Sequence, residues 1–561
     1  MTRYVDIPLN PENALFSKSH GDRMKRPFRG ADALIQTLQA AGVRRIFTLS
    51  GNHIMSVFDA AFGTGIELVH TRHEASAVHM ADAWARIVGD VGVALVTGGP
   101  GHANAVAALY TAQMAEAPIV LLSGHAPNDK LGQGAFQEMR QAEMAAPVCK
   151  AAWTCIHADD VAGDVTKAIR IAKAGRPGPV HLSLPSDVLE GMTSTDIAAV
   201  IAFTPELMPL DDRVAAQLVQ RLADAKRPMI LVGPSSMTKA GRVLTDALQK
   251  ASGVPVIGME SPRGVGDASL GAFAQLLLRV DCLVLIGKRM DFTLKFGAAF
   301  PATTPVHQID AEVEEIHRSR RALGERLKIT AQADSNSALR ALTQASLVAS
   351  DSGWLREVRA EVAYRPASWN SAVSQLPDRL HPVQMLHPLQ AVLDSHPDAV
   401  LVCDGGEIGQ WAMACLRAPH RVNNGVAGSI GAGLPYALAA RLAQPDAPVV
   451  AVMGDGTVGF HIAEFDTAVR YGLSFLVVVG NDARWNAEYQ LQLRDYGTER
   501  LNGCELRPTR YDMVAQAFGA HGECLTDAGT LPQAIQRAIA SNMPACLNVR
   551  IEGVPAPLIS H

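Results

Sequence analysis

A glycine-flanked aspartate and an asparagine 26 residues further along are suited to chemistry on an anionic ligand. Asp455 stands in Gly454-Asp455-Gly456 directly after the apolar run VVAVM, and Asn481 follows the run FLVVVG. Two parallel strands joined by one helix would place both side chains in one crevice. A carboxylate and an amide oxygen suit Mg²⁺, which keeps phosphate oxygens as further ligands. The free N–H groups at Gly456 and Thr457, where the helix begins, can bind a diphosphate.

The elements that must position these residues follow from short apolar runs that alternate with alanine-rich amphipathic stretches. The runs include VGVALVTGG and APIVLLSG in the first third, PMILVG and CLVLIG in the second, and AVLVCDGG and ACLNVRI in the last. Continuous apolar strands with helices between them are typical of parallel sheets buried on both faces. The predicted fold class is therefore α/β, with three consecutive doubly wound parallel-sheet domains.

Two polar or proline-rich stretches separate these units. One lies near residues 196–213, and the other runs from about 345 to 383. We therefore place an N-terminal extension and three domains at residues 1–27, 28–190, 205–345 and 380–555. The first and third domains should share an architecture, although no short sequence repeat relates them.

The overall composition argues against several partners and locations. The formal net charge is −5 and the pI is near 6.4, so the chain carries no basic footprint for nucleic acid. No apolar run reaches the ~20 residues that span a bilayer, and the polar N-terminus lacks the apolar region of a signal peptide. Eight cysteines are scattered without a C-x-x-C motif, which indicates reduced core residues. We expect a cytoplasmic protein that binds neither nucleic acid nor membrane.

A lone Gly-Asp-Gly is usually a simple turn, but the whole segment from Gly454 to Ala483 resembles the thiamine diphosphate (ThDP) binding motif. That motif has GDG and, after one helix and one strand, an asparagine pair. The chain departs from it at Gly480, where the first asparagine usually stands. The resemblance implies ThDP and Mg²⁺ as cofactors. It also implies Asp455, Asn481 and the backbone carbonyl of Ala483 as the metal ligands.

Further cofactor contacts are implied in two glycine-rich segments upstream, CDGGE and GSIGAGLP. In the second segment, Ile430 matches the bulky residue that is wedged between the two rings of ThDP and forces a bent shape on it. A core isoleucine after a glycine turn is the alternative. The implied cofactor-binding set is Gly405, Gly406, Glu407, Ser429, Ile430, Gly454, Gly456, Thr457 and Asn481.

A glutamate in the first domain can activate such a cofactor. Glu74 follows the run IELVH at the start of a predicted helix, where the helix dipole alone also favours a glutamate. The stretch RHE-x-x-A, with ADAWAR and VALVTGGPGHANA after it, resembles the pyrimidine-binding domain of acetolactate-synthase-like enzymes. The resemblance implies that Glu74 hydrogen-bonds the pyrimidine ring and promotes loss of the thiazolium C2 proton. It further implies that Glu74 of one chain meets Asp455 of another, in a homodimer or homotetramer.

Two more side chains are expected to face the reactive carbon. His53 lies at the turn of a predicted strand–turn–helix, FTLSGNHIMSVFDA, and histidine suits acid/base work near neutral pH. Benzaldehyde lyase and the 2-hydroxyacyl-CoA lyases have a histidine there, whereas acetolactate synthases carry a small apolar residue. Gln137, in GAFQEMRQ, matches a glutamine that lies beside the thiazolium in many relatives and can hydrogen-bond a substrate oxygen. The alternatives are a structural histidine and a loop amide that contacts backbone.

The central domain, between the pyrimidine-binding and diphosphate-binding domains, discriminates among members of the family. The run LVLIGKRMDFTLKFGAAF…VHQIDAEVEEI resembles enzymes whose central domain carries ADP or coenzyme A (CoA). Arg289 and Lys295 would then hold phosphates, and Asp310 would accept from a ribose hydroxyl. Surface charges on a remnant domain are the alternative. Three residues of a polar helix or lid after the metal loop should border the substrate: Trp485, Glu488 and Tyr489.

These expectations favour a ThDP-dependent 2-hydroxyacyl-CoA lyase, which cleaves its acyl-CoA substrate to formyl-CoA and an aldehyde or ketone. The reverse reaction would join them. The alternatives within enzymes are a CoA-free acyloin lyase or carboligase of the benzaldehyde-lyase kind and an acetolactate-synthase-like carboligase. A catalytically silent scaffold or regulatory subunit is the alternative from another class. The presence of Glu74, Asp455 and Asn481 argues against the silent protein.

Overall fold

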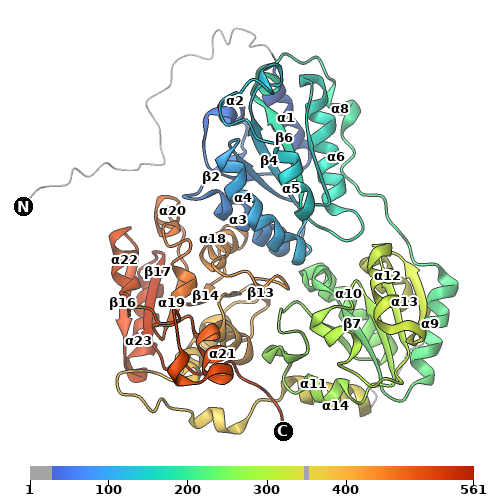
Figure 1. The fold of residues 1–561 in the computed structure, drawn as a ribbon, viewed down its shortest axis with the longest axis vertical. Helices are drawn as coiled ribbons and strands as arrows, with labels where there is room; N and C mark the ends of the chain where they lie inside the picture. The colour runs from blue at the N-terminus through green and yellow to red at the C-terminus, as the bar shows by residue number, and fades with distance from the viewer. Residues whose placement is uncertain (1–27, 347–352) are drawn as a thin grey trace, which may run out of the picture.

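Three parallel sheets, each flanked by helices, form the chain. The computed structural model describes residues 28–346 and 353–561, so the expected N-terminal extension, residues 1–27, lies outside the described residues. Figure 1 shows the sheets at the corners of a triangle, with the first domain at the top, the third at the lower left and the central domain at the lower right. The predicted α/β class with three parallel-sheet domains is confirmed.

The first sheet has the strand order β2-β1-β3-β4-β6-β5, with every neighbouring pair parallel. Its strands are β1 (Arg45–Thr48), β2 (Glu67–His70), β3 (Gly92–Val96), β4 (Ile119–His125), β5 (Ala151–Thr154) and β6 (Val180–Pro185). One face is covered by α1 (Gly30–Ala40), α2 (Met55–Ala61) and α6 (Val161–Lys173), and the other by α3 (Glu74–Val88) and α4 (Pro100–Met114). Cover on both faces explains why β3 and β4 are apolar and buried throughout.

The third sheet repeats that connectivity in the order β13-β12-β14-β15-β17-β16. Its strands are β12 (Val400–Cys403), β13 (His420–Asn423), β14 (Val449–Gly454), β15 (Leu476–Asn481), β16 (His521–Leu525) and β17 (Ala545–Arg550). One face packs against α15 (Pro382–Leu386), α17 (Glu407–Cys415) and α23 (Leu531–Ala540), and the other against α18 (Gly433–Ala443), α20 (Glu464–Arg470) and α22 (Tyr511–Ala517). The shared architecture of the first and third domains is as the sequence predicts.

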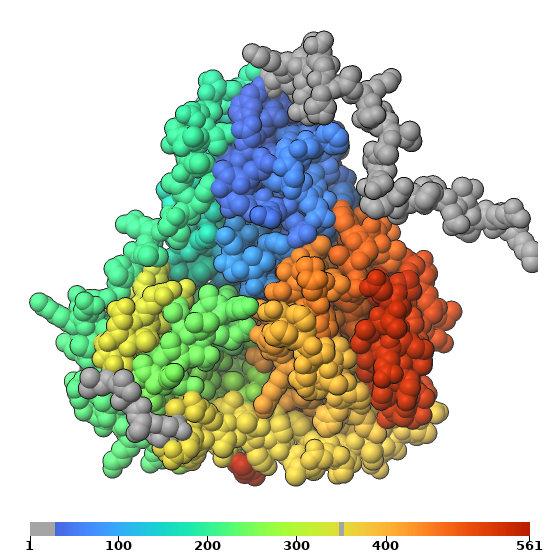
Figure 2. Space-filling model, turned by 180° about the vertical axis from the view of Figure 1, so that it is seen from behind, coloured from blue at the N-terminus to red at the C-terminus, as the bar shows by residue number. Residues whose placement is uncertain are grey.

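The central sheet is smaller and has the order β11-β10-β9-β7-β8. Its strands are β7 (Pro228–Val232), β8 (Val256–Gly258), β9 (Cys282–Ile286), β10 (Val306–Asp310) and β11 (Leu327–Gln332). Its flanking helices are α9 (Asp212–Asp224), α10 (Lys239–Ser252) and α13 (Ser335–Ala345) on one face and α11 (Phe273–Leu277), α12 (Val313–Leu323) and α14 (Gly353–Ala363) on the other. In Figure 2 the yellow segment from α14 to α15 runs along the base of the molecule, beneath the central and third domains.

In each sheet the strand order reverses at one switch point in the middle of the sheet, between β1 and β3, between β7 and β9, and between β12 and β14. In open parallel sheets the crevice at the carboxyl ends of the strands beside such a point is the usual ligand site. His53 follows β1, Glu74 follows β2, and the GDG segment follows β14, so all three lie at carboxyl edges. The sequence predicts one helix between GDG and the next strand, and the structure has two. The first is the single turn α19 (Asp455–Val458), which Gly456 and Gly459 weaken, and α20 is separate.

Two expectations from composition can be compared with the structure. No helix in residues 28–346 and 353–561 is both long and apolar enough to cross a membrane. All eight cysteines lie in described residues, none forms a disulfide there, and most are buried. Burial raises the pKa of the Cys149 and Cys403 thiols to about 12, which keeps them protonated and unreactive.

A buried polar network joins the first domain to the third where α3 packs on α18. Asp82 is fully buried and accepts hydrogen bonds from the Tyr436 hydroxyl at 2.7 Å and from Arg86 Nη2 at 3.3 Å. Arg86 also donates to the carbonyl of Asn423 at 2.9 Å, and its guanidinium lies over the Tyr436 ring. Burial raises the pKa of Asp82, and the adjacent Arg86 opposes that shift. Loss of one of these hydrogen bonds would leave a buried polar group without its partner, which lowers stability in a low-dielectric interior.

Tyr436→Phe removes one donor from the buried Asp82 and should lower the free energy of unfolding by about 1–3 kcal/mol. The measurement is the midpoint of urea or thermal unfolding, followed by circular dichroism. Tyr110→Phe is the matched control, because Tyr110 is 46% exposed on α4, and it should change stability by less than about 0.5 kcal/mol. Equal effects of the two variants would show that the network does not hold the domains together.

Candidate active site

Glu74 is the first residue of α3 and lies against the loop that follows β3. Only 9% of the residue is exposed, and its Oε2 atom accepts a hydrogen bond from Asn104 at 3.0 Å. A Cβ atom at Gly101 would lie 3.3 Å from Glu74 Oε1 and 2.7 Å from the side chain of Thr97. A neutral amide and a glycine-rich loop therefore fix the carboxylate in place.

His53 approaches the same loop. Its Nδ1 atom lies 3.2 Å from Thr97 Oγ1, its ring stacks on Phe136 with centroids 6.0 Å apart, and 6% of the residue is exposed. A Cβ atom at Gly124 would lie 2.6 Å from His53 Cβ, so this close approach needs glycine. Burial lowers the pKa of His53 below 6.5; the backbone of Phe136 opposes this shift and His125 adds to it. The ring is therefore neutral at pH 7 and can accept a proton.

Gln137 lies on the other side of that loop. Its φ of 58° is a left-handed conformation that costs free energy in a residue with a side chain and is common at functional sites. A Cβ atom at Gly99 would lie 2.7 Å from Gln137 Cβ. The three predicted catalytic residues thus surround one glycine-rich loop: Glu74, His53 and Gln137.

The GDG segment borders a cavity of about 70 Å³ at the carboxyl edge of the third sheet. Of the predicted residues, those that border it are Gly406, Glu407, Ile430, Gly454, Asp455, Gly456, Thr457, Trp485 and Glu488. Gly405 lies beside it, since a Cβ atom there would approach the Thr457 side chain to 3.1 Å. Ser429 does not line the cavity, although it precedes Ile430, which does. Segments from three strand ends of the third domain therefore meet at one place.

A glycine turn organised by Asp404 holds Ile430 at this cavity. Asp404 Oδ2 accepts the backbone N–H groups of Gly431 at 3.1 Å and Gly433 at 2.7 Å. Gly431 has a φ of 95°, and a Cβ atom there would lie 2.6 Å from Phe460, so only glycine fits. Burial raises the pKa of Asp404 to about 6, and the two N–H groups oppose the shift. Sequence analysis missed this positioning residue, although an aspartate at a strand end before two glycines was a visible signal.

Two carboxylates, the buried Asp455 and the half-buried Asp482, border the cavity together. Burial raises the pKa of both, and the adjacent Asp455 raises that of Asp482 further; backbone N–H groups of Gly456, Ala483 and Arg484 face Asp455 and oppose its shift. The Asp455 Oδ2 atom has no hydrogen-bond partner among the described residues. Within that part of the chain, no group of three or more His, Cys, Asp or Glu side chains is arranged for a metal. A carboxylate pair nevertheless suits Mg²⁺ when phosphate oxygens complete its shell.

Asn481 is expected as a metal ligand, but the structure puts Asp482 at the cavity instead. The Asn481 amide donates to Asn548 Oδ1 at 3.0 Å and to the carbonyl of Thr509 at 2.9 Å, which ties it to β17. Its buried Oδ1 atom lacks a partner among the described residues, yet the residue does not border the cavity. Successive side chains along a strand alternate between faces, so Asp482 shares the face of Gly480, which borders the cavity. The alternation identifies Asp482 only after the structure has shown that Gly480 borders the cavity.

The expected ligand role of the Ala483 carbonyl also needs correction. This carbonyl accepts the backbone N–H of Leu506 at 2.7 Å, whereas the N–H of Ala483 faces Asp455. The φ of 61° at Ala483 is unfavourable for alanine, and it turns the chain just after β15. Arg484, the next residue, does border the cavity.

Glu407 borders the cavity and is paired with the central domain. Its Oε2 atom lies 3.1 Å from Arg263 Nη2. Burial raises the pKa of Glu407, and the guanidinium of Arg263 opposes that shift. The carboxylate therefore reaches the cavity with a cation beside it, which reduces its repulsion of a bound diphosphate.

The predicted lid is α21 (Asn486–Tyr496), which has no buried residue. Trp485 precedes it and packs on the GDG turn, since a Cβ atom at Gly456 would lie 2.5 Å from its ring. Glu488 also borders the cavity. Tyr489 does not, because its ring packs 4.1 Å from the Arg484 guanidinium carbon. Two of the three expected lid residues thus lie at the cavity.

The three residues of the central domain that were expected to bind a nucleotide either form ion pairs with other side chains or are exposed to solvent. Asp310 is 1% exposed and forms an ion pair with Arg176 of the first domain, which corrects its expected role toward a ribose. Arg289 Nε lies 3.3 Å from Glu315 Oε1. Lys295 is exposed on a bend where its φ is 48°. The structure does not bring the three side chains together in one vacant site.

Comparison with family models and curated proteins agrees with this geometry. Residues 28–144 match a model described as the N-terminal thiamine pyrophosphate (TPP) binding domain of thiamine pyrophosphate enzymes. Residues 404–549 match the corresponding C-terminal TPP binding domain. Thiamine pyrophosphate is another name for ThDP. The two matches contain the two groups of residues described above.

Full-length relatives cover nearly the whole chain. A probable acetolactate synthase of Mycobacterium bovis is 33% identical, over 92% of this chain and 94% of the relative. The 2-hydroxyacyl-CoA lyase 2 of Homo sapiens is 32% identical, over 89% of this chain and 85% of the relative. The acetolactate synthase large subunit of Parasynechococcus marenigrum is 30% identical, over 93% and 87%. With both ThDP-binding domains matched and three α/β units in order, the chain belongs to the thiamine pyrophosphate enzyme family.

Proposed function

We propose that this protein is a ThDP-dependent carbon–carbon lyase that cleaves a 2-hydroxyacyl-CoA to formyl-CoA and an aldehyde or ketone, or joins these in reverse. The observation that carries the proposal is the buried His53, whose pKa is lowered and which contacts the same loop after β3 as Glu74 and Gln137 do. A neutral base there suits removal of a hydroxyl proton. The similarity to 2-hydroxyacyl-CoA lyase 2 supports the same reaction class.

The residues around the third-domain cavity fit a diphosphate held through a metal ion. The Oδ2 atom of Asp455 has no hydrogen-bond partner among the described residues and can therefore bind a metal ion. Gly405 and Gly456 leave space that a side chain at either position would fill. Backbone N–H groups at the start of α19 suit phosphate oxygens, and the Thr457 hydroxyl, which donates to the Gly454 carbonyl at 3.0 Å, holds the turn. Bound ThDP supplies a carbanion equivalent that adds to carbonyl groups.

Asp455 and Asp482 are the proposed Mg²⁺ ligands, with the backbone carbonyl of Arg484 as a third. The adjacent Asp455 raises the pKa of Asp482, and a divalent cation between the two carboxylates would remove that repulsion. Phosphate oxygens and water would complete six-coordination. Asn481 then supports the strand end through Asn548 instead of binding the metal.

The roles proposed for the first-domain residues follow from their chemistry. Glu74 would hold the pyrimidine ring of ThDP through a hydrogen bond and so promote activation of the cofactor. His53 takes the proton of the substrate 2-hydroxyl while the bond between C1 and C2 breaks, which releases the carbonyl product. Gln137 donates its amide N–H to the oxygen on C1 as charge develops there. A proton then returns to C1, so formyl-CoA forms without net oxidation or reduction.

A second copy of the chain is part of the proposal. Every residue that lines the 70 Å³ cavity comes from the third domain, and Glu74, His53 and Gln137 do not border it. A complete site needs both groups. We therefore propose a homodimer or a homotetramer in which the first domain of one copy faces the third domain of another.

A CoA-free acyloin lyase or carboligase is the second candidate. The commitment of Asp310 to Arg176 and of Arg289 to Glu315 favours it, since these residues were expected to bind the nucleotide of CoA or ADP. Condensation of the acetolactate-synthase kind is a further candidate, which the similarity to acetolactate synthases supports. The candidates differ in whether a CoA thioester is turned over.

The decisive experiment is a panel of 2-hydroxyacyl-CoA thioesters and acyloins, including benzoin, with and without ThDP and Mg²⁺. We expect formyl-CoA and an aldehyde in equal amounts, detected by liquid chromatography, only when both cofactors are present. Glu74→Ala should abolish turnover in the same assay. Cleavage of benzoin without any thioester turnover would replace the proposal by the acyloin lyase, and acetolactate from pyruvate would replace it by the synthase.

His53→Ala should lower kcat by about 100-fold or more, in the range for loss of a general base. Because burial lowers the pKa of His53 below 6.5, the wild-type rate should stay level above pH 7 and fall only below pH 6.5, as the ring takes up a proton. The variant should lose that acid limb. His157→Gln, at an exposed histidine, is the control and should keep both the rate and the profile. An unchanged pH profile in His53→Ala would exclude its role as base.

Asp482→Ala should weaken Mg²⁺-dependent ThDP binding by at least about 100-fold, which is the upper range for groups that only support a ligand. Quenching of tryptophan fluorescence can report binding, because Trp485 borders the cavity. Asn481→Ala should destabilise the fold through lost hydrogen bonds to Asn548 and Thr509, with a smaller effect on the Mg²⁺ requirement. The opposite ranking would restore Asn481 as the ligand.

A further inference from the structure

The central domain has a crevice of the kind that binds nucleotides, at the reversal of strand order between β7 and β9. The chain leaves β7 through Gly233 and leaves β9 through Gly287, which has a φ of 60°. A Cβ atom at Gly233 would lie 2.1 Å from the carbonyl oxygen of Gly287, so the two loops touch. Glycine loops at this place normally let a phosphate approach the backbone.

In this chain, two side chains of the first domain enter that crevice. Glu116, just after α4, and Arg176, just before β6, are 3% and 8% exposed, and they form an ion pair with each other. Arg176 Nη1 donates to the carbonyl of Gly287 at 3.0 Å, and Nη2 pairs with Asp310 at the end of β10. The guanidinium thus bridges the first domain to two strand ends of the central sheet.

The Glu116 carboxylate occupies the position of an anion. Its Oε2 atom accepts the backbone N–H of Ser235 at 3.0 Å, in the turn directly after β7. Backbone N–H groups in this first turn are the usual donors to a nucleotide phosphate. Glu116 has a φ of 58°, an unfavourable backbone conformation for glutamate. This unfavourable backbone conformation therefore occurs at Glu116, whose side chain reaches the crevice.

Charges around the crevice are already compensated without a ligand. The carboxylates there are Glu116, Asp291, Asp310 and Glu315, and the cations that pair with them are Arg176, Lys288, Arg289 and Arg318. Lys288 is 3% exposed and donates to Thr293 Oγ1 at 2.7 Å and to the carbonyl of Arg289 at 2.8 Å. A nucleotide diphosphate would add negative charge where each of these cations is already paired with a carboxylate, so the nearby carboxylates would repel it.

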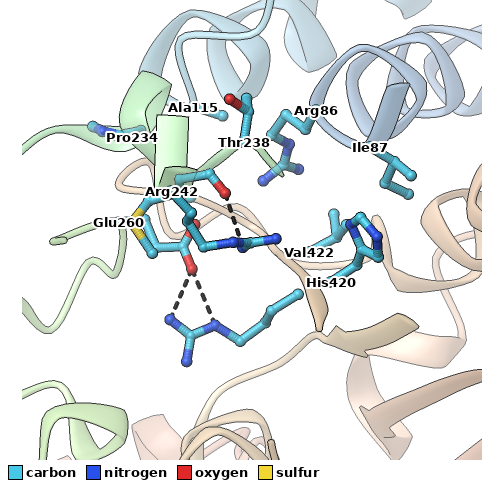
Figure 3. Close-up of a pocket in the computed structure, with 12 residues that line it drawn as sticks. Arg86, Ile87, Ala115, Pro234, Thr238, Arg242, Glu260, His420 and Val422 are labelled. Carbon is cyan, nitrogen blue, oxygen red and sulfur yellow. Dashed lines mark hydrogen bonds and ion pairs between the residues drawn. The ribbon is translucent and has the colours of Figure 1, made fainter. Parts of the chain in front are cut away.

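The neighbouring space at the junction of the three domains is also filled. Figure 3 shows it beside the same turn after β7, with Pro234 and Thr238 on its wall. Arg421 donates to Glu260 Oε1 through Nε at 3.0 Å and through Nη2 at 2.8 Å. Arg242 donates to the carbonyl of Met237 at 2.9 Å. The cavity left between them is about 20 Å³, enough for one water but not for a phosphate.

We propose that Glu116 and Arg176 are a built-in occupant of the nucleotide crevice, with the Glu116 carboxylate in the place of a nucleotide phosphate. The pair fastens the first domain to the central domain, as a bound dinucleotide would. The central domain therefore takes no ADP in this crevice. Any CoA substrate must hold its nucleotide portion elsewhere. This inference does not depend on which acyl substrate the enzyme uses.

The first test is calorimetric titration of the full-length wild-type protein, loaded with ThDP and Mg²⁺, with ADP. We expect no binding that depends on Arg176. If ADP does bind, Arg176→Ala locates it: unchanged binding in that variant places ADP outside the crevice and agrees with the proposal. Binding to the wild type that Arg176→Ala abolishes would overturn it.

The second test opens the crevice. Glu116→Ala should create an ADP response, seen as a rise in melting temperature of about 2 °C or more at saturating ADP, and Glu116→Ala/Arg176→Ala should lose that response. Glu523→Ala is the matched control, since Glu523 pairs with Arg537 away from the crevice, and it should show no ADP response.

Glu116→Gln keeps the size of the side chain and its acceptor for Ser235, so it serves if Glu116→Ala fails to fold. It should likewise show an ADP response, because the charge that repels phosphate is gone. If the Glu116 variants respond to ADP no more than Glu523→Ala does, Glu116 does not stand in for a phosphate and the proposal fails.

Discussion

The packing of α3 against α18 is the contact on which the rest of the structure depends. It merges the apolar cores of the first and third sheets into one cluster. The helix α3 begins at Glu74, and α18 follows the glycine turn that carries Ile430. Residues from both domains that would serve the cofactor are therefore anchored to one interface. Because protein interiors are close-packed and transmit strain, a change of volume at this interface moves both sets of residues.

Buried charged groups are paired in different ways at three places in the structure, and the difference indicates where chemistry can occur. Asp82 is satisfied by Tyr436 and Arg86 at the α3–α18 interface. Glu116 and Asp310 are satisfied by Arg176 in the central crevice. Asp455 and Asp482 repel each other, and Asp455 Oδ2 has no partner among the described residues. Buried polar groups are normally paired, so this carboxylate oxygen at a strand end supports the proposed role of Asp455 as a metal ligand. The repulsion between the Asp455 and Asp482 carboxylates therefore marks the end of the site that we assign to the cofactor.

The choice among reactions rests on the other end of the site. Relatives named as lyases and as acetolactate synthases are similar to this chain to nearly the same degree. Overall similarity therefore does not separate the reactions, and individual side chains must. A buried histidine with a lowered pKa provides a neutral base, which a small apolar residue at position 53 would not. The self-contained central crevice adds a second constraint, because it leaves the nucleotide of any CoA substrate to be bound by other surfaces.

The sequence by itself determined the strands, their order into three parallel units, and the position of Glu74 and the GDG segment at strand or helix ends. These features follow from local apolar runs and glycine punctuation, which act over a few residues. It did not determine which side chain after β15 faces the cavity, because the turn at Ala483 depends on pairing with Leu506. Nor did it show that Asp310 belongs to Arg176, 134 residues away in the chain. Tertiary structure decided both, since charge pairing across domains depends on packing that no local pattern encodes.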